Sequence, residues 1–425
     1  MCYAIPGKIV ELQGKIAIID YFGEKRKAIN DFIEARIGEY VYAQGGLVVA
    51  KVPKKKAEEI LNFWKNRFFE LKSLDKRMSE VKVKGSPKFL YLIEKTTKSE
   101  LTKKEMIEII KTNRENDLKL LFETANNIRQ RFHGNSCCVH GIIEFSNYCE
   151  NNCFYCGIRK DSKIKRYRMS IKEIVETAKE AVKKYGFKSL VLQSGEDFWY
   201  TEEKLLRIVK ETSKLGILLF LSIGERSEKT YEKLYNAGAR GVLLRFETSN
   251  EKIFKKLRPG KSLKKRISLI KNLRNMGYII ATGFLIGLPG ESEKDIVNNI
   301  LLTKKLKPEM YSFGPMIPAK NTPLENHKQV DKNLVLKTIA LSRLIDKKAK
   351  ILVTTALETL DKNAKKQGLL SGANSLMINV TPLKYRRLYG IYPNRAGSDK
   401  EIDENIKETV DLLYSLGRAP TDLGL

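Results

Sequence analysis

Short stretches in which apolar and polar residues alternate cover the first part of the chain, and glycine-containing turns separate them. Such alternation predicts strands at Gly7–Leu12, Lys15–Asp20, Glu24–Ala28 and Tyr40–Val52. Apolar residues then recur at helical spacing from Lys56 to Lys72, and a polar stretch follows. We therefore expect a small β-barrel with a trailing helix at residues 1–75 and a linker at residues 76–90.

Beyond residue 90 the pattern changes to helices and then to strands that alternate with amphipathic helices. Two helices are predicted first, at Lys103–Lys111 and Glu115–Phe132. Strands are predicted at Gly141–Ser146, Ser189–Gln193, Ile217–Ile223, Gly241–Phe246, Ile279–Ile286, Met310–Phe313, Ile351–Thr354 and Ser375–Ile378. A helix at Ile402–Leu416 follows the last of them. Eight such units indicate an α/β fold, a (β/α)8 barrel of the TIM type at residues 91–425, with its chemistry at the carboxyl ends of the strands.

Composition limits the classes of partner and compartment. The 425 residues carry a formal net charge of +29, but the lysines are spread over every segment instead of clustering with aromatic residues. This pattern favours a solvated surface over a nucleic-acid site. No apolar run approaches the ~18 residues that span a bilayer, and the start of the chain lacks the features of a signal peptide. We therefore expect a cytoplasmic protein without a membrane partner.

Five of the six cysteines lie within a short segment, which indicates metal or redox chemistry and not a disulfide scaffold. Cys149, Cys153 and Cys156 directly follow a predicted strand, in the spacing C-x3-C-x2-C. Thiolates hold iron–sulfur clusters, and three of them leave one iron of a cubane open. A structural zinc site would need a fourth ligand. The nearby candidates, Cys137, Cys138 and His140, stand upstream of the predicted strand, so the spacing favours a cluster.

The segment GIIEFSNYCENNCFYCGIRK closely resembles the radical S-adenosylmethionine (SAM) superfamily. In that superfamily the open iron of a [4Fe-4S] cluster binds SAM, and one electron cleaves SAM to a 5′-deoxyadenosyl radical. The resemblance implies an anaerobic enzyme that contains this iron-sulfur cluster, uses SAM and receives electrons from an external donor. A closed barrel suits such a radical, because the radical would otherwise react with its surroundings.

Further motifs narrow the resemblance. LVLQSGEDFWY, LLRFETSN, KLRPGKSLKKR, IGLPGES, VTTALET, SGANSLMINVTP and RRLYGIYP occur in the order and spacing of HydE, the radical enzyme of [FeFe]-hydrogenase maturation, and of its relatives in the biotin synthase and methylornithine synthase group. The match extends from about Leu90 to the carboxyl terminus. IGLPGES lacks the Lys-Ser/Thr ending of a phosphate loop, so we interpret it as a strand-to-helix turn.

The resemblance implies roles for individual residues. Cys149, Cys153 and Cys156 would hold the catalytic cluster, and Tyr155 would lie near the adenine of SAM. The polar groups of SAM would contact Gln193, Ser194, Gly195, Glu196, Glu247 and Arg266. An ammonium group pairs well with a carboxylate, and a carboxylate pairs well with a guanidinium group. Glu247 and Arg266 supply these two groups. Residues that match the substrate cavity of HydE are Arg245, Met310, Thr354, Thr355, Met377, Tyr389 and Tyr392.

Two departures from HydE concern metal and substrate. No cysteine follows Cys156, so the second cluster of some HydE proteins is expected to be absent. Phe246 stands where at least some HydE sequences have histidine. This difference bears on the substrate more than on the fold.

The amino-terminal sequence MCYAIPGKIVELQGKIAIIDYFG resembles HypC/HupF, the small barrel chaperone of [NiFe]-hydrogenase assembly. In that family the cysteine after the initiator methionine carries an iron with CO and cyanide ligands, which makes Cys2 a possible iron ligand here. HypC proteins also bear a histidine in a stretch that corresponds to VYAQGG. Gln44 occupies that stretch here, and an amide is a poor ligand for soft low-spin iron.

The two resemblances together suggest maturation of a hydrogenase-type iron cofactor, in which the small barrel handles an iron–CO/CN complex and the large barrel performs radical chemistry on it. The partners would be a small-molecule or iron-complex substrate and hydrogenase-maturation proteins or an apo-enzyme. Two alternatives remain open at this point: a mutase or synthase acting on a small organic substrate such as an amino acid, and a non-catalytic scaffold whose basic surface binds an acidic apo-hydrogenase. A further alternative, an RNA-modifying radical enzyme, is supported only by the positive charge of the chain.

Cys137 and Cys138 have no role in these motifs. Adjacent cysteines do not easily bind one metal together, which favours a structural role. The alternative is a secondary metal site that includes the flanking His133 and His140.

Overall fold

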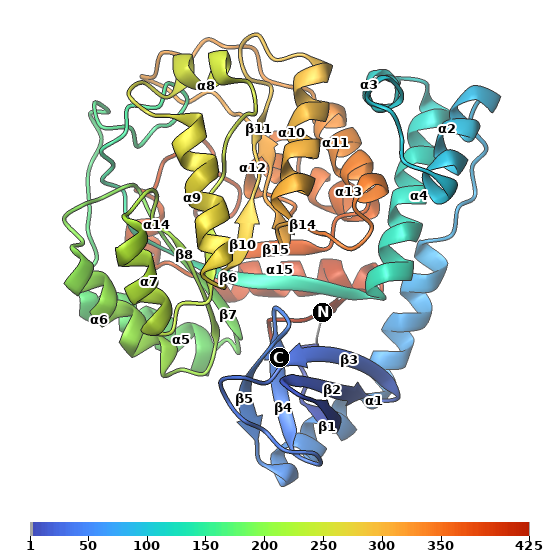
Figure 1. The fold of residues 1–425 in the computed structure, drawn as a ribbon, viewed down its shortest axis with the longest axis vertical. Helices are drawn as coiled ribbons and strands as arrows, with labels where there is room; N and C mark the ends of the chain where they lie inside the picture. The colour runs from blue at the N-terminus through green and yellow to red at the C-terminus, as the bar shows by residue number, and fades with distance from the viewer. Residues whose placement is uncertain (1–2, 425) are drawn as a thin grey trace.

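The computed structural model describes residues 3–424 and contains two barrels (Figure 1). The small barrel lies below the large one in Figure 1, and α1 rises from it beside the large barrel. The order around its closed sheet is β1-β2-β3-β5-β4. Its strands are β1 (Gly7–Gln13), β2 (Ile16–Tyr21), β3 (Glu24–Ile29), β4 (Tyr40–Gln44) and β5 (Leu47–Val52).

The prediction of a single strand at Tyr40–Val52 was wrong, because two glycines divide it into a hairpin. Gly45 and Gly46 have φ angles of +60° and +86°, which a two-residue turn between antiparallel strands requires. Leu47, at the start of β5, packs with Leu218 and Ile279 of the large barrel. These two residues lie at the amino ends of their strands, so the hairpin covers the floor of the large barrel, opposite its carboxyl ends.

Helices connect the two barrels more fully than the sequence predicted. They are α1 (Lys54–Met78), α2 (Pro87–Lys98), α3 (Lys103–Lys111) and α4 (Glu115–His133). The predicted linker at 76–90 is therefore helical at both of its ends. Phe89, Leu92 and Ile93 are buried and anchor α2, whose first residue is a proline. The buried carboxylate of Asp75 on α1 lies 2.8 Å from both Arg129 and Arg418, which ties α1 to α4 and to the carboxyl-terminal segment.

The large barrel confirms the predicted (β/α)8 fold. Its parallel strands are β6 (Ser136–Ser146), β7 (Ser189–Ser194), β8 (Leu218–Ser222), β9 (Gly241–Leu243), β10 (Ile279–Thr282), β12 (Met310–Tyr311), β14 (Lys350–Ile351) and β15 (Ser375–Asn379). They follow the order β14-β12-β10-β9-β8-β7-β6-β15, and a bridge between Leu352 and Ser375 joins the two end strands. The sheet thus forms a nearly closed barrel.

Three short strands lie at the two ends of this barrel. They are β11 (Leu285–Ile286), β13 (Gly314–Pro315) and β16 (Ala419–Pro420). β11 pairs with β13, and β16 pairs with the first residues of β6. The predicted strand Ile279–Ile286 is interrupted at Gly283, where a Cβ atom would lie 2.3 Å from the carbonyl oxygen of Ser312. The backbones approach so closely there that the ladder breaks.

Helices surround the barrel and alternate with its strands (Figure 1). They are α5 (Ile171–Lys183), α6 (Glu202–Ser213), α7 (Glu228–Asn236), α8 (Glu251–Leu257), α9 (Leu263–Asn275), α10 (Glu293–Leu306), α11 (Lys332–Ile345), α12 (Thr355–Leu360), α13 (Ala364–Leu370), α14 (Leu383–Arg386) and α15 (Ile402–Ser415). None of the helices within residues 3–424 is both long and apolar enough to cross a bilayer.

The first barrel strand begins earlier than predicted. β6 starts at Ser136 instead of Gly141, because β15 and β16 pair with its first half. Cys137, Cys138 and His140 are therefore part of the strand, and the expectation that they precede it was wrong. They lie at the end of β6 opposite Cys149, Cys153 and Cys156, so they do not complete a zinc site with those cysteines.

Candidate active site

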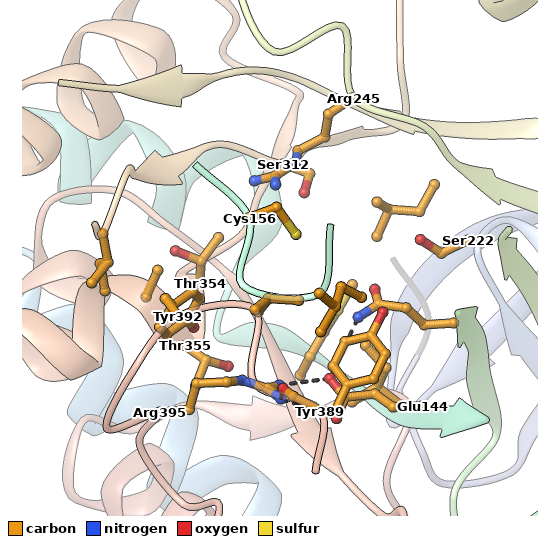
Figure 2. A pocket seen from close by; sticks show the side chains of 18 of the residues that line it. Glu144, Cys156, Ser222, Arg245, Ser312, Thr354, Thr355, Tyr389, Tyr392 and Arg395 are labelled. Atoms are coloured by element: carbon orange, nitrogen blue, oxygen red, sulfur yellow. Dashed lines mark hydrogen bonds and ion pairs between the residues drawn. The ribbon is translucent and has the colours of Figure 1, made fainter. Parts of the chain in front are cut away.

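A cavity of about 340 Å³ opens at the carboxyl ends of the barrel strands (Figure 2). Sixteen of the seventeen residues that the resemblance assigned to the barrel site line this cavity. They are Cys149, Cys153, Tyr155, Cys156, Gln193, Ser194, Gly195, Glu196, Arg245, Glu247, Arg266, Thr354, Thr355, Met377, Tyr389 and Tyr392. The remaining one, Met310, is 2% exposed and packs in the apolar layer beneath the cavity.

The three cysteines lie on the loop that follows β6, and the turn after β7 holds this loop in place. The Glu196 backbone N–H donates to Sγ of Cys149 over 3.4 Å. A Cβ atom at Gly195 would lie 2.0 Å from the carbonyl oxygen of Tyr148, so only glycine permits this approach. Burial raises the pKa of the Cys156 thiol, and the neighbouring Cys153 and Cys149 raise it further. The three sulfur atoms are thus close enough to repel one another as thiolates.

This donor set fits an iron–sulfur cluster. As thiolates, the three cysteines at one end of the cavity would carry negative charge that a bound metal centre would offset. The buried guanidinium of Arg258 also lines the cavity, and Cys153 and Tyr155 help to raise its pKa despite burial. Figure 2 shows the Cys156 side chain pointing into the space between Arg245 and Tyr389. A group held by the three cysteines would therefore face the cavity.

Glu247 supplies a carboxylate oxygen without a hydrogen-bond partner. Its φ angle is +68°, a conformation that costs energy in any residue other than glycine. Oε2 is buried and accepts no hydrogen bond from any described residue, and Nε of Arg245 is 3.6 Å away. Arg258 lies 3.9 Å from the other oxygen. A strained residue with an unsatisfied carboxylate oxygen fits the ammonium group of a bound amino acid or of SAM.

Two further predicted residues already form ion pairs with partners that the sequence did not single out. Burial raises the pKa of Glu196, but Lys261 at 2.7 Å and the Glu225 backbone N–H lower it by more. The pKa of this carboxyl therefore lies below its usual range. Arg266 donates to the Glu225 carboxylate over 2.7 Å and to the carbonyl oxygen of Arg245 over 2.5 Å. These two hydrogen bonds therefore fix Arg266 at the cavity wall.

The sequence analysis missed the most buried ion pair of the cavity. Glu144 of β6 is fully buried and forms two hydrogen bonds with Arg395, over 2.6 Å and 3.1 Å. Asn379 donates to the same carboxylate over 2.7 Å. Figure 2 shows this pair beside Tyr389. A signal was present: Glu144 is the one acidic residue in β6, two positions from its end.

The remaining sequence-predicted residues lie away from the cavity. Cys2 is outside the described residues. Gln44 is 1% exposed and lies in the hairpin region at the floor. His133 contacts Arg343, whose Nη1 lies 3.0 Å from its Nε2, and does not join His140 in a metal site. Cys137 is fully buried in the main core of the large barrel.

Comparisons with known proteins agree with this site. Residues 143–302 match the Radical SAM superfamily, residues 1–64 match the HupF/HypC family, and residues 312–418 match the Biotin and Thiamin Synthesis associated domain. The chain is 39% identical over 330 residues to the [FeFe] hydrogenase maturase subunit HydE of Thermotoga maritima, which covers 77% of this chain and 94% of that protein.

This chain is a radical SAM enzyme of the HydE type. It also carries a HupF/HypC domain at its amino end. The enzymes of this superfamily use a [4Fe-4S] cluster and SAM, and Cys149, Cys153 and Cys156 lie within the matched residues.

Other relatives of this chain have different activities. The chain is 31% identical to the 3-methylornithine synthase of Methanosarcina acetivorans, over 76% of this chain and 91% of that one. The crystal structure of methylornithine synthase (PylB) aligns with a TM-score of 0.71 at 27% identity and covers 77% of this chain and 97% of that chain. The [FeFe]-hydrogenase maturase HydG from Carboxydothermus hydrogenoformans shares the fold, with a TM-score of 0.63 at 20% identity over 85% of this chain and 93% of that one.

Proposed function

We propose that this radical SAM enzyme matures a hydrogenase-type iron cofactor. When bound, the cluster and SAM supply a 5′-deoxyadenosyl radical. Cys149, Cys153 and Cys156 would hold the cluster. The partnerless oxygen of Glu247 would accept from the ammonium group of SAM, and the glycine-containing turn after β7 would bind its methionine end.

The inner part of the cavity has the character of an anion site. Arg245 and Thr354 line it, and the Thr354 hydroxyl is buried without a hydrogen-bond partner among the described residues. Glu144 and Arg395 neutralise each other at its lower wall. The apolar layer below, which includes Met310 and Leu352, separates the cavity from the floor and would keep water away from a radical.

The observation that carries the proposal is the joining of two domains. A barrel 39% identical to HydE is covered on its floor by a hairpin of a domain that matches the HupF/HypC family. The substrate would be an iron complex with CO, cyanide and cysteine ligands. The partners of the enzyme would be hydrogenase-maturation proteins or an apo-enzyme, together with an electron donor.

The test is a turnover assay with the anaerobically reconstituted enzyme, SAM and a reductant. A cysteinyl iron carbonyl-cyanide complex should raise the rate of 5′-deoxyadenosine formation at least about tenfold above the rate without substrate. The infrared bands of its CO and cyanide ligands should shift as the product forms. C156A should abolish cleavage of SAM, whereas C137A, which changes a buried cysteine outside the cavity, should retain it. Cleavage of SAM without any effect of the iron complex would refute the proposed substrate.

One observation favours a second candidate, an amino-acid mutase. A free Thr354 hydroxyl beside Arg245 would also fit a substrate carboxylate, and 3-methylornithine synthase is 31% identical. In the same assay, an amino acid such as lysine would then stimulate 5′-deoxyadenosine formation and be consumed, whereas the iron complex would not. The two candidates thus predict opposite results from one experiment.

A further inference from the structure

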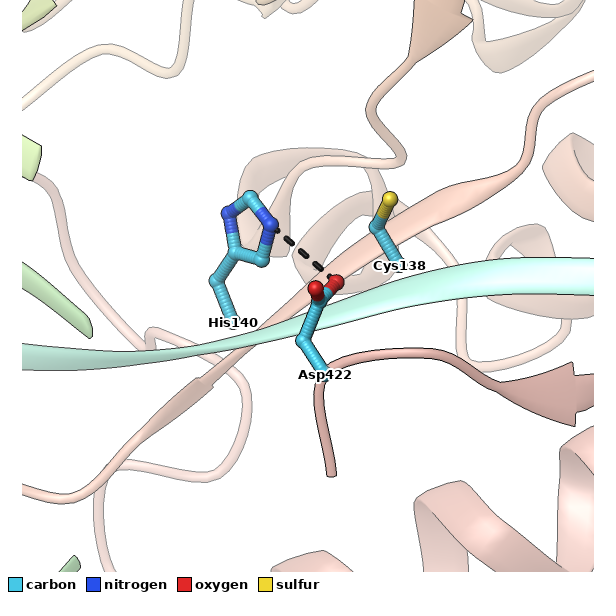
Figure 3. Close-up of side chains that lie close together, drawn as sticks. All are labelled: Cys138, His140 and Asp422. Carbon is cyan, nitrogen blue, oxygen red and sulfur yellow. Dashed lines mark ion pairs between the residues drawn. The ribbon is translucent and has the colours of Figure 1, made fainter. Parts of the chain in front are cut away.

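Three side chains of types that bind metals meet on the floor of the large barrel, at the opposite end from the cysteine loop (Figure 3). Sγ of Cys138, an imidazole nitrogen of His140 and a carboxylate oxygen of Asp422 all lie within 4.8 Å of one another. Nε2 of His140 is 3.2 Å from Oδ2 of Asp422. All three residues are buried, with relative exposures of 1%, 3% and 1%. The cavity at the carboxyl ends of the barrel strands is lined by none of them.

The strand register explains how they meet. Cys138 and His140 are two residues apart on β6 and therefore share one face of the strand. Ile142 and Glu144 continue this face upward and line the large cavity. At ~3.3 Å per residue, His140 lies roughly 13 Å below Glu144 along the strand. Asp422 reaches the same place because β16 pairs with the start of β6.

The surroundings hold the side chains in this arrangement. The His140 ring stacks on Phe220, with centroids 5.5 Å apart. The Thr421 hydroxyl donates to Oδ2 of Asp422 over 3.0 Å, and the Asp422 carbonyl oxygen accepts from the Lys188 N–H over 2.7 Å. Such outer contacts orient metal ligands in known sites. Their presence means that binding would require little rearrangement.

The donor set selects a class of metal. One thiolate, one imidazole and one carboxylate suit borderline divalent ions such as Zn²⁺ and Fe²⁺, and they exclude Mg²⁺ and Ca²⁺, which prefer oxygen ligands. Tetrahedral bonds of about 2.0–2.3 Å place the ligand atoms about 3.5 Å apart, so the observed spacing needs only a small contraction. Three protein ligands leave a fourth position for an exogenous ligand, as in catalytic and not in structural zinc sites.

A cavity lies between the two barrels, lined by chain neighbours of Asp422. This cavity of about 180 Å³ is lined by Tyr3 and Ala4 of the small barrel and by Pro420 and Leu423, which flank Asp422 on either side. A buried ion pair between His140 and Asp422 alone would explain two of the residues. It would not explain a third ligand residue of a different chemical type at the same point.

We propose that Cys138, His140 and Asp422 form a binding site for one divalent transition-metal ion at the interface of the two barrels. The site is separate from the cluster that the proposed function uses, and its test does not depend on radical activity.

Cobalt(II) is the probe, because thiolate ligation gives it a charge-transfer band in the near ultraviolet and tetrahedral geometry gives it visible absorption. The titration uses the full chain with C149A, C153A and C156A, so that the cluster cysteines cannot bind the ion. One equivalent of Co²⁺ should produce both bands, and Zn²⁺ should displace it. C138S, H140A and D422N, each added to this background, should weaken binding at least about tenfold.

C137S is the matched control, because Cys137 is the adjacent cysteine and is equally buried. It should leave the titration unchanged. C2S should leave the charge-transfer band in place. Loss of the band in C137S or C2S together with its retention in C138S would overturn the proposal, as would the absence of any stoichiometric binding in the background protein.

A crystal of the reconstituted holoenzyme provides a second measurement that does not depend on the folding of any variant. After a Zn²⁺ soak, an anomalous peak at the zinc edge should appear within about 2.3 Å of Sγ of Cys138. No peak at this position at millimolar zinc would overturn the proposal.

Discussion

Glu144 and Arg395 form the most buried ion pair of the active-site cavity, with 2.6 Å between Oε1 of the first and Nη2 of the second. The side chain of Glu144 is fully buried and that of Arg395 is 10% exposed. The guanidinium contacts both carboxylate oxygens, which is the strongest geometry for such a pair. The pair joins the first barrel strand to the loop before α15.

Removal of one partner should therefore be costly. R395M leaves the Glu144 carboxylate buried without its cation, and we expect the free energy of unfolding to fall by about 3–5 kcal/mol. The double variant E144Q/R395M should lose less than R395M alone, because no uncompensated charge remains. Guanidinium denaturation of the three proteins under anaerobic conditions provides the measurement.

The control for this pair is an exposed one. Arg387 and Asp399 lie 3.1 Å apart, with side chains 57% and 78% exposed. R387M should lower the free energy of unfolding by less than about 1 kcal/mol. Equal losses in R387M and R395M would contradict the importance of the buried pair.

Glu247 combines strain with a proposed contact to SAM, so stability and binding should change in opposite directions. In E247G the φ angle of +68° becomes acceptable, and we expect the free energy of unfolding to stay constant or to rise by about 1 kcal/mol. Loss of the carboxylate should weaken SAM binding at least about tenfold, measured by calorimetry on the reconstituted enzyme.

Lys307 provides the matched control for E247G. It has a φ angle of +49° at the end of α10, outside the cavity. K307G should give a similar gain in stability without any change in SAM affinity. If E247G bound SAM as tightly as the wild type, Glu247 would not be the ammonium ligand.

Local motifs in the sequence were sufficient to predict the cysteine loop but not the contacts that surround it. Cys149, Cys153 and Cys156 lie within eight residues, so their spacing alone predicts that their sulfur atoms converge. Glu144 and Arg395 are 251 residues apart, and only the closed sheet brings them together. The pairing of Asp422 with His140 likewise depends on β16, whose two residues carry no recognisable strand pattern.

The errors in element boundaries have equally specific causes. A run such as Tyr40–Val52 alternates correctly on both sides of Gly45 and Gly46, so periodicity could not show the turn. The polar residues around Glu80 resemble a linker, but α1 persists to Met78 because buried Asp75 pairs with Arg129 and Arg418. Tertiary contacts decided both cases.

Glu291 predicts a pH dependence of stability. It lies in the turn before α10 and accepts from the backbone N–H of Gly287 over 2.7 Å, and burial raises its pKa from 4.5 to about 7. The folded carboxyl thus keeps its proton to a higher pH than the unfolded one. Its contribution to stability is complete below about pH 4.5 and is lost as the pH rises through 7.

E291Q cannot ionise but keeps a carbonyl oxygen for the Gly287 N–H. Relative to the wild type, its free energy of unfolding should be higher by up to about 3 kcal/mol at pH 8, and the difference should vanish near pH 4.5. E293Q, on the same turn of the chain, is the control and should follow the wild-type profile. Parallel profiles of E291Q and the wild type between pH 4.5 and 8 would contradict the raised pKa.

Gly45 lies at one of the contacts between the two barrels, and its neighbour Gly46 provides an internal control. Both residues have positive φ angles, so alanine strains either position. A Cβ atom at Gly45 would also lie 2.6 Å from Cδ2 of Leu218, whereas at Gly46 it would meet nothing within 4 Å. We expect G46A to cost about 1 kcal/mol and G45A to cost a further 1–3 kcal/mol, because the hairpin must move off the barrel floor. Proteolysis after Lys51 and Lys54–Lys56 should then accelerate in G45A much more than in G46A. Equal acceleration would mean that the hairpin tip does not hold the two barrels together.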